Sequence, residues 1–233
     1  LGAVRHKGMI PWDDDIDLWV PREDYERLLK LGAEMRKFSL RLNSPELNTG
    51  YYLGEAKISD INTTIWEHRC LPFVFGVFID IFPIDQTSVS KDEMILYYDH
   101  FKETTNSYID IISVFDWKDY IYALRHKNIK LLIKRIHNRN KKDSWRKRVI
   151  DATRAIKNDK NGDHMVTITG EYREREYLPI QWFEKTLEMP FEDFSIRIPS
   201  GYDGYLSQLY GNYMALPPIE KRYSHHKKYY MNL

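Results

Sequence analysis

The sequence has little of what defines several common protein classes. Its 233 residues include one cysteine, Cys70, so no internal disulfide can form, which fits a reducing compartment. No run approaches the roughly 18 apolar residues of a membrane span, and no signal peptide is visible. Lysine and arginine number 35 against 34 acidic residues, so no excess positive charge points to nucleic acid. We therefore expect a cytoplasmic protein that does not bind nucleic acid.

Common catalytic motifs are also missing. The sequence has no Gly-rich P-loop, no dinucleotide fingerprint and no nucleophile elbow, and Cys70 has no obvious partners for a zinc site. Apolar residues make up 42% of the chain and charged residues 30%. This composition predicts one globular domain, or one domain with a large insertion.

The most informative stretch is an acidic run near the start of the chain. Asp13, Asp14, Asp15 and Asp17 are followed by an apolar segment at residues 18–20. If a strand covers residues 15–20, Asp13, Asp15 and Asp17 point to one side of it. Carboxylates this close raise one another's pKa, and a divalent cation relieves their repulsion. The run therefore favours a site for a hard cation such as Mg²⁺ that handles a phosphorylated substrate.

Two other interpretations of the run stay open. Acidic runs are more often solvated turns, although Gly8 and Pro11 before this run and the apolar segment after it favour the metal site. A calcium loop would use alternate aspartates as ligands. Against it, Leu18 stands where a glycine is required and Asp24 where a glutamate is expected.

A second acid interrupts the apolar run at residues 73–82, FVFGVFIDIF. A carboxylate inside an apolar strand is costly unless it is paired or bound to a metal, so Asp80 is a candidate ligand. The alternative is an aspartate at a strand end that meets a backbone amide. With Asp15 and Asp17 on a neighbouring strand, Asp80 would complete a set of carboxylates that hold one or two metals for displacement at phosphorus.

Basic residues near the acids are candidates for holding phosphate oxygens. Arg5, His6 and Lys7 form a basic trio that suits phosphate contacts, with a solvated turn as the alternative. Lys57 lies in an expected strand over residues 52–58 and is a second candidate.

Short strands and helices are expected along most of the chain. Asp85, after Pro83, is expected to cap the element that follows it. Periodicity predicts helices over 21–37 and 201–210, the latter ending at Gly211, and strands or strand pieces at 38–43, 52–58, 73–82, 165–169, 177–190 and 191–199.

Residues 90–157 differ from the rest because they lack proline and have helical periodicity. Ser90 and Glu93 form a capping-box pattern before a helix over 91–107. A second helix is expected over 118–138. Its basic face carries Arg125, Lys127, Lys130, Lys134, Arg135 and Arg139. Such a face belongs either to a solvated helix of an insertion or to a helix that lies on an anionic membrane surface.

The stretch LGAVRHKGMIPWDDDIDLWVPREDYERL closely resembles the opening motif of the LicD/fukutin family of phosphotransferases. Three further segments resemble this family: AKISDINTT at 56–64, FGVFIDIFPID at 75–85 and DGYLSQLYGNYMALPPIEKRYSHH at 203–226. In the family a Gly-Thr-Leu usually precedes the Leu-Gly-Ala, so we expect a truncated N-terminus.

The resemblance implies an α+β fold with a nucleotidyltransferase-like mixed sheet flanked by helices. It implies one catalytic domain over residues 1–233, with a helical insertion at about 90–160. The implied reaction is metal-dependent transfer of phosphocholine from CDP-choline to a sugar hydroxyl of a teichoic acid or lipopolysaccharide precursor, with Mg²⁺ or Mn²⁺ as cofactor. A lipid-linked glycan acceptor would place the protein at the inner face of the membrane, touching it through the basic helical region.

The resemblance also implies roles for single residues. Asp15 and Asp17 resemble the metal-binding pair, with Asp13 close by. Asp80 resembles the third acid, as a metal ligand or as the base that takes the acceptor proton. Lys57 resembles a phosphate-contacting residue. The expected catalytic residues are Asp17, Lys57 and Asp80; the expected metal ligands are Asp13, Asp15, Asp17 and Asp80; the expected donor contacts are Arg5, His6, Lys57 and Thr63.

Other functions stay open at this point. The donor can be another CDP-alcohol, such as CDP-ribitol or CDP-glycerol, or a nucleotide. A calcium-dependent glycan-binding module and a membrane-peripheral scaffold are the non-enzymatic alternatives. A choline head group cannot donate an N–H hydrogen bond, so aromatic faces and acids would have to recognise it. The candidates are Trp12, Trp19, Trp66, Tyr51, Tyr52 and the tyrosines near the C-terminus.

Overall fold

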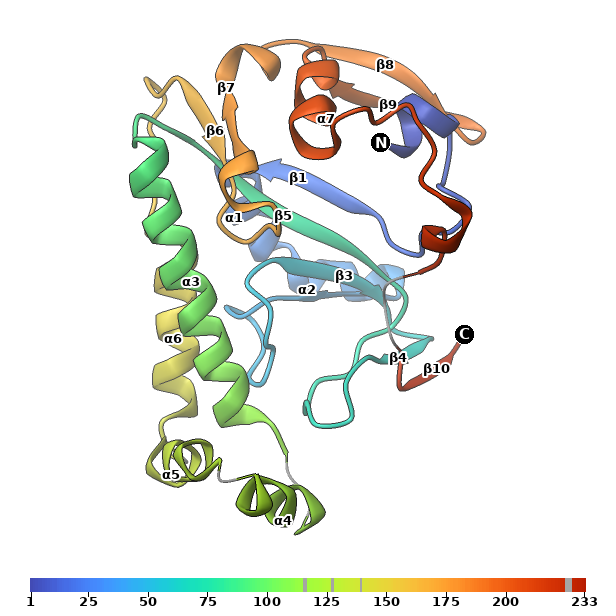
Figure 1. Cartoon of the computed structure of the whole chain (residues 1–233). Coiled ribbons are helices and arrows are strands. Elements are labelled where there is room, and N and C mark those ends of the chain that lie inside the picture. Colours follow the sequence, from blue (N-terminus) through green and yellow to red (C-terminus); the bar gives the residue numbers. More distant parts are fainter. Residues whose placement is uncertain (115–116, 127, 139, 225–227) are drawn as a thin grey trace.

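A mixed sheet of six strands forms the centre of the molecule in the computed structural model (Figure 1). The structure describes residues 1–114, 117–126, 128–138, 140–224 and 228–233. The strand order is β2-β3-β5-β6-β7, and β1 pairs with β5. The strands are β1 (Asp17–Pro21), β2 (Leu40–Asn43), β3 (Ala56–Asp60), β5 (Phe78–Thr87), β6 (His164–Val166) and β7 (Tyr177–Pro179). The β1–β5 pair is parallel and the other pairs of this sheet are antiparallel, which confirms a mixed sheet.

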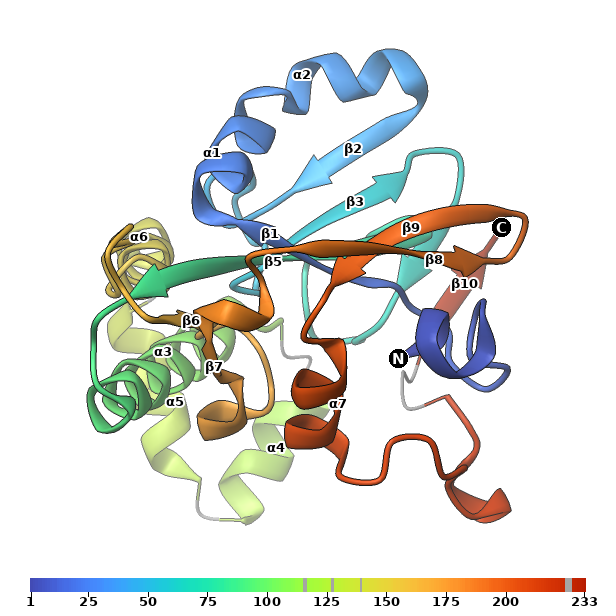
Figure 2. The same ribbon diagram turned by 90° about the horizontal axis from the view of Figure 1, so that it is seen from above.

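One face of the sheet is covered by α1 (Arg22–Lys30) and α2 (Gly32–Met35), as Figure 2 shows. Tyr25 and Leu29 of α1 form a core cluster with Ala56 of β3 and Ile81 of β5. Because side chains alternate along a strand, the residues next to Ala56 and Ile81 point to the opposite face. That opposite face therefore carries Lys57 and Asp80.

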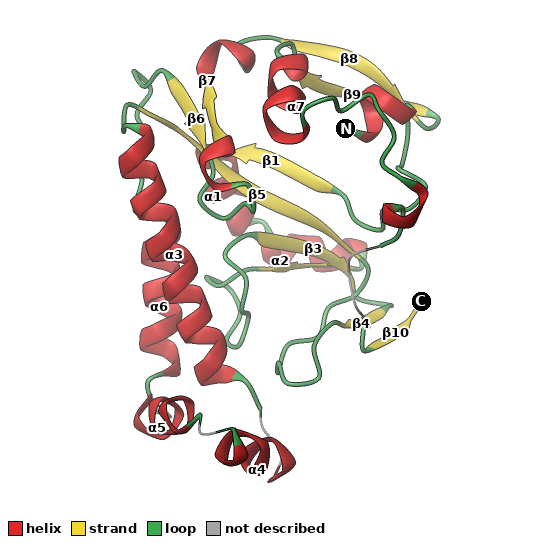
Figure 3. Cartoon of the chain, viewed as in Figure 1, coloured by secondary structure: helices red, strands yellow, loops and turns green. Residues whose placement is uncertain are grey.

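Helices α3 (Lys91–Ile112) and α6 (Lys142–Thr153) pack side by side beside the sheet (Figures 1 and 3). Ser90 and Glu93 make both hydrogen bonds of the expected capping box, and α3 runs longer than predicted. The single helix expected over 118–138 is instead two helices, α4 (Trp117–Arg125) and α5 (Ile129–Asn138). Lys127 and Arg139 of its predicted basic face lie outside the described residues. None of the helices, over the described ranges, is long and apolar enough to cross a bilayer.

The C-terminal third adds a hairpin and a helix. Strands β8 (Thr186–Phe191) and β9 (Phe194–Pro199) pair with each other, and α7 (Tyr202–Tyr210) ends at Gly211 as predicted. Strand β4 (Thr64–Trp66) pairs with β10 (Tyr230–Asn232). The short helical elements are η1 (Gly2–His6), η2 (Arg36–Phe38), η3 (Arg173–Glu176), η4 (Ile180–Trp182) and η5 (Ile219–Lys221).

Several predicted strands begin later than expected. β1 starts at Asp17, so Asp13 and Asp15 precede the strand instead of lying in it. The parallel ladder with β5 begins at the Asp17–Asp80 pair, and the last contact before it is the hydrogen bond from the Asp80 N–H to the Ile16 carbonyl oxygen, at 2.9 Å. The helix expected over 21–37 is interrupted after Lys30, where Gly32 lowers the helix propensity.

The prediction that Asp85 caps the next element is wrong. Asp85 lies inside β5, and both of its carboxylate oxygens accept hydrogen bonds from the Arg22 guanidinium, at 2.9 and 2.6 Å. Arg22 also donates to the carbonyl oxygen of Thr153 at the end of α6, at 2.8 Å. Both side chains are buried, so this ion pair joins α1, β5 and α6.

We predict that Asp85→Asn lowers the free energy of unfolding by about 3 kcal/mol, because it leaves the buried Arg22 charge without its counter-charge. Urea unfolding followed by circular dichroism measures this change. The matched control is Asp24→Asn, which removes the exposed ion pair with Arg27 and should cost no more than about 0.5 kcal/mol. Equal losses in the two variants would contradict the anchoring role of Asp85.

Candidate active site

The predicted acids meet on the sheet face opposite α1. Asp17 and Asp80 are register partners in the parallel β1–β5 pair, so their side chains share one face. Asp15 joins them from the segment before β1, and carboxylate oxygens of Asp15, Asp17 and Asp80 lie within 4.8 Å of one another. Asp13, Asp14 and Asp15 form a second group of the same kind. Oxygen atoms at this spacing can bind a divalent cation together.

Lys57 lies beside the acids on the same face. It is the register partner of Asp80 across the antiparallel β3–β5 pair, and its Nζ lies 2.6 Å from Asp80 Oδ1. Both residues are only 5% exposed. The Lys57 ammonium also sits 3.5 Å from the ring centroid of Phe78, a cation–π contact. An ammonium group has three N–H donors, so Lys57 can hold Asp80 and still donate to a substrate oxygen.

Crowding changes the protonation of the acids. Desolvation, followed by the charges of Asp15 and Asp80, raises the pKa of Asp17 to about 7, although Lys57 opposes the shift. Desolvation and the neighbouring Asp15 raise the pKa of Asp13 to about 6. Without a cation, part of the cluster therefore holds protons near neutral pH. A divalent cation would have to displace these protons when it binds.

Arg5 and His6 come from η1 and lie against the C-terminal segment. Arg5 Nη1 donates to the carbonyl oxygen of Tyr213 at 2.9 Å. The Arg5 guanidinium is 5.9 Å and that of Arg222 is 5.3 Å from the ring centroid of Trp12, and the His6 ring meets Trp12 edge-on. Arg222 was not singled out from the sequence, although it lies in the segment at 203–226. The last two residues of that segment, His225 and His226, lie outside the described residues.

The structure places Thr63 apart from Lys57, on the turn that follows β3. Its hydroxyl accepts a hydrogen bond from the Val77 N–H at 2.7 Å and donates to the Asp60 carbonyl oxygen at 3.1 Å. Thr63 also lines an open pocket of about 240 Å³ with Arg41 and Gly76. The hydroxyl therefore holds the β3–β4 turn, whereas Lys57 lies near the start of β3.

Helix α7 and the turn η3 form a wall beside the acids that sequence reasoning did not find. Trp19, on the same face of β1 as Asp17, contacts the ring of Tyr205 on α7 with 5.0 Å between centroids. Tyr172 contacts Tyr210, the last residue of α7, with 5.5 Å between ring centroids. The only signal available in the sequence was the abundance of tyrosine near the C-terminus.

A buried acid lies in the same wall. Glu176, at the end of η3, is only 3% exposed, and its burial raises its pKa to about 8. The Asp17 charge acts on Glu176 and also raises the pKa of Tyr172, Tyr205 and Tyr210. The Asp17 charge therefore influences the titration of residues in η3 and α7.

Comparisons with known proteins match the chain to one family model and one relative. Residues 1–113 match the family model described as LicD/FKTN/FKRP, nucleotidyltransferase domain. The lipopolysaccharide cholinephosphotransferase LicD of Haemophilus influenzae is 27% identical over 247 residues, which cover 97% of this chain and 83% of that protein. No solved structure matches. The matched range 1–113 contains the acids and Lys57, whereas α7 and η3 lie beyond it.

We predict a pH-dependent response of stability to Mg²⁺ that Asp17→Asn removes. The folded pKa of Asp17, about 7, lies above its ordinary value of 3.8, so the folded state holds this proton more tightly. Without metal, the free energy of unfolding should therefore fall as the pH rises from about 4 to 7. Removing the carboxylate should raise it by about 1 kcal/mol at pH 7.5, after allowance for solvent screening.

Urea unfolding at pH 5.5 and 7.5, with and without Mg²⁺, measures both effects. Mg²⁺ should stabilise the wild type more at pH 7.5, where the acids are deprotonated. Asp193→Asn, in the turn between β8 and β9, is the control and should behave like the wild type. The metal assignment is wrong if Mg²⁺ stabilises Asp17→Asn as strongly as the wild type.

Proposed function

We propose that this chain, whose residues 1–113 match the LicD/FKTN/FKRP family model, is a metal-dependent transferase that moves phosphocholine from CDP-choline to a sugar hydroxyl of a cell-surface glycan. The observation that carries this proposal is the meeting of Asp15, Asp17 and Asp80 on one sheet face, with Lys57 beside them. The Haemophilus relative is a lipopolysaccharide cholinephosphotransferase, which supports a lipopolysaccharide acceptor and a choline phosphate group. A teichoic acid precursor is the other glycan acceptor that we consider.

Asp15, Asp17 and Asp80 would hold Mg²⁺ or Mn²⁺, and Asp13 would support them from the neighbouring group. The bound cation supplies charge neutralisation and polarises the pyrophosphate. Lys57 keeps the Asp80 carboxylate in place and donates to a phosphate oxygen of the donor. Arg5 and Arg222, held at Trp12, are placed to neutralise the remaining phosphate charge, with His6 beside them.

In the proposed reaction, the acceptor oxygen forms a bond to the phosphorus that carries choline. The bond from this phosphorus to the bridging oxygen breaks, and CMP leaves with that electron pair. A carboxylate of the acid cluster accepts the proton of the attacking hydroxyl.

The fold around the site fits the same proposal. We propose that the sheet with α1 and α2 is the nucleotidyltransferase-like part that the family description names. The helices over residues 91–153 would then be an insertion into one catalytic domain.

We predict metal-dependent CMP release from CDP-choline in the absence of acceptor, at a rate that Asp17→Asn lowers at least 100-fold. The physical reason is the loss of a metal ligand whose cation stabilises the transferring phosphoryl group. Chromatographic detection of CMP, with Mg²⁺, with Mn²⁺ and with a chelator, measures the rate. CDP-ribitol and CDP-glycerol are run in parallel. If CMP is released faster from CDP-ribitol or CDP-glycerol than from CDP-choline, the proposed phosphocholine transfer is wrong and the transferred group is that alcohol phosphate.

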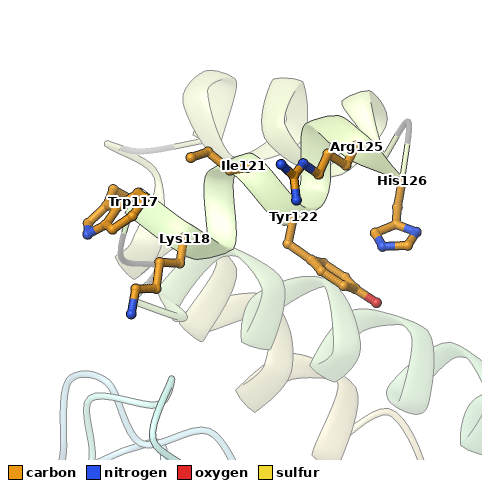
Figure 4. Close-up of a pocket in the computed structure, with 6 residues that line it drawn as sticks. All are labelled: Trp117, Lys118, Ile121, Tyr122, Arg125 and His126. Atoms are coloured by element: carbon orange, nitrogen blue, oxygen red, sulfur yellow. The ribbon is translucent and has the colours of Figure 1, made fainter.

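Helices α4 and α5 support a further part of the proposal, contact with an anionic membrane surface. Trp117 and Tyr122 are 67% and 65% exposed, and Lys118 and Arg125 are exposed beside them. With Ile121 and His126 they line an open pocket of about 370 Å³ (Figure 4). The pair of helices lies at the end of α3 and α6 that is far from the sheet (Figure 1). Exposed aromatic rings interleaved with basic groups match the chemistry of a bilayer with anionic head groups.

This contact would hold the protein at the cytoplasmic face of a membrane that carries a lipid-linked acceptor. We predict that Trp117→Ser combined with Tyr122→Ser lowers the affinity for phosphatidylglycerol vesicles at least tenfold, because the variant loses buried apolar area at the interface. Vesicle co-sedimentation measures the affinity. The control is Phe38→Ser. It removes an exposed aromatic ring on η2, which is distant from α4 in the sequence.

Two results would contradict the membrane assignment. The first is equal binding of the wild type and the double variant to these vesicles. The second is a wild type that ignores vesicles but dimerises in sedimentation velocity runs while the double variant stays monomeric, which would make this surface an interface between copies of the chain.

A further inference from the structure

Tyr172 and Tyr210 form an open corner of two aromatic rings. Tyr172 precedes η3, and Tyr210 is the last residue of α7. Their ring centroids are 5.5 Å apart and their planes meet at 83°. Both side chains remain substantially exposed, at 36% and 43%. Two perpendicular rings that face solvent offer adjoining π-faces to a small ligand.

Hydrogen bonds from side chains to backbone carbonyl oxygens join the two segments of this corner. Arg175 Nη1 donates to the Leu209 carbonyl oxygen at 2.9 Å. Gln208 Nε2 donates to the carbonyl oxygens of Arg175 and Tyr177, at 2.7 and 3.1 Å. These bonds connect η3 and the strand after it to α7. The two rings are therefore placed before any ligand arrives, which reduces the entropic cost of binding.

A buried carboxylate lies behind the corner. Glu176 accepts a hydrogen bond from the Tyr172 N–H at 3.2 Å, and among the described residues no lysine or arginine forms an ion pair with it. Its carboxylate packs against Gly170, where a Cβ atom would lie 2.2 Å from an oxygen atom. Burial raises the pKa of Glu176 to about 8, although the charge of Lys102 opposes the shift. A ligand with a positive charge would favour the ionised carboxylate over the protonated form.

The other aromatic candidates for binding a cationic ligand are already engaged. Tyr51 and Tyr52 are buried in the core around α3. Trp66 forms a similar edge-on pair with Tyr229, with 5.0 Å between centroids, but it lies on β4, outside the central sheet that carries Asp17 and Asp80. Trp12 already has two guanidinium groups near its ring. The corner at η3 and α7 thus combines exposed rings, a nearby acid and proximity to Asp17.

We propose that Tyr172, Tyr210 and Glu176 form a subsite for a quaternary ammonium group. Such a group has no N–H to donate, so it binds to aromatic faces and carboxylates, as this corner offers them. In phosphocholine, only two methylene groups separate the ammonium nitrogen from the phosphate ester oxygen. A subsite next to the metal-binding acids is therefore where the head group has to lie. This inference rests on the proposed function and adds to it the residues that select choline over uncharged alcohols.

Donor affinities of matched variants test the subsite. Tyr172→Ala and Tyr210→Ala should each weaken binding of CDP-choline at least tenfold in calorimetry with Mg²⁺, and change binding of CDP-glycerol less than twofold. Tyr172→Phe and Tyr210→Phe keep the π-faces and should stay within about threefold of the wild type. Phe38→Ala, on η2, is the control for removal of an exposed aromatic ring.

The subsite and the proposed function fail in different ways. If the wild type releases CMP from CDP-choline but the alanine variants bind this donor as the wild type does, the subsite is wrong and the function stands. Equal weakening of both donors would also overturn the subsite, because it would indicate a general structural role. If the wild type neither binds nor cleaves CDP-choline, the proposed choline donor is wrong and the subsite is overturned with it.

Discussion

The repulsion among the aspartates is the constraint on which the rest of the site depends. Register alone places Lys57, Asp80 and Asp17 in a row across β3, β5 and β1, on the face that α1 leaves uncovered. Lys57 neutralises only one of these acids, and the raised pKa values of Asp13 and Asp17 show the remaining imbalance. A chain that keeps such an arrangement sacrifices stability for a function that needs concentrated negative charge.

The sheet face and the η3–α7 segments carry two different sets of chemical groups. The sheet face supplies oxygen ligands and one ammonium group, which are groups that deal with metal and phosphate. The wall of η3 and α7 supplies aromatic rings and a buried carboxylate, which are groups that deal with an organic cation. The two sets come from opposite halves of the chain, and the family match at 1–113 covers only the first. In the proposed enzyme, η3 and α7 would select the donor, while the sheet face would bind the metal and the phosphates.

The sequence was most informative where local pattern and chemistry coincide. The acidic run, the lone Asp80 in an apolar segment and the capping box at Ser90 are each readable within a few residues, and the structure brings the acids together as expected. Tyr172 and Glu176 could not be found in this way, since their importance arises only when η3 packs against α7. The Arg22–Asp85 pair was missed for the same reason, because its partners are 63 residues apart.

The contact between Arg5 and the Tyr213 carbonyl oxygen joins positions 208 residues apart. Contacts of such sequence separation form slowly, because a large loop has to close before they contribute. During synthesis, which proceeds from the N-terminus, the acids near residue 15 emerge long before α7 and Trp12's partner Arg222. The aspartates therefore leave the ribosome before the segment that contacts Arg5 and Trp12, and the site is complete only after α7 and Arg222 have followed.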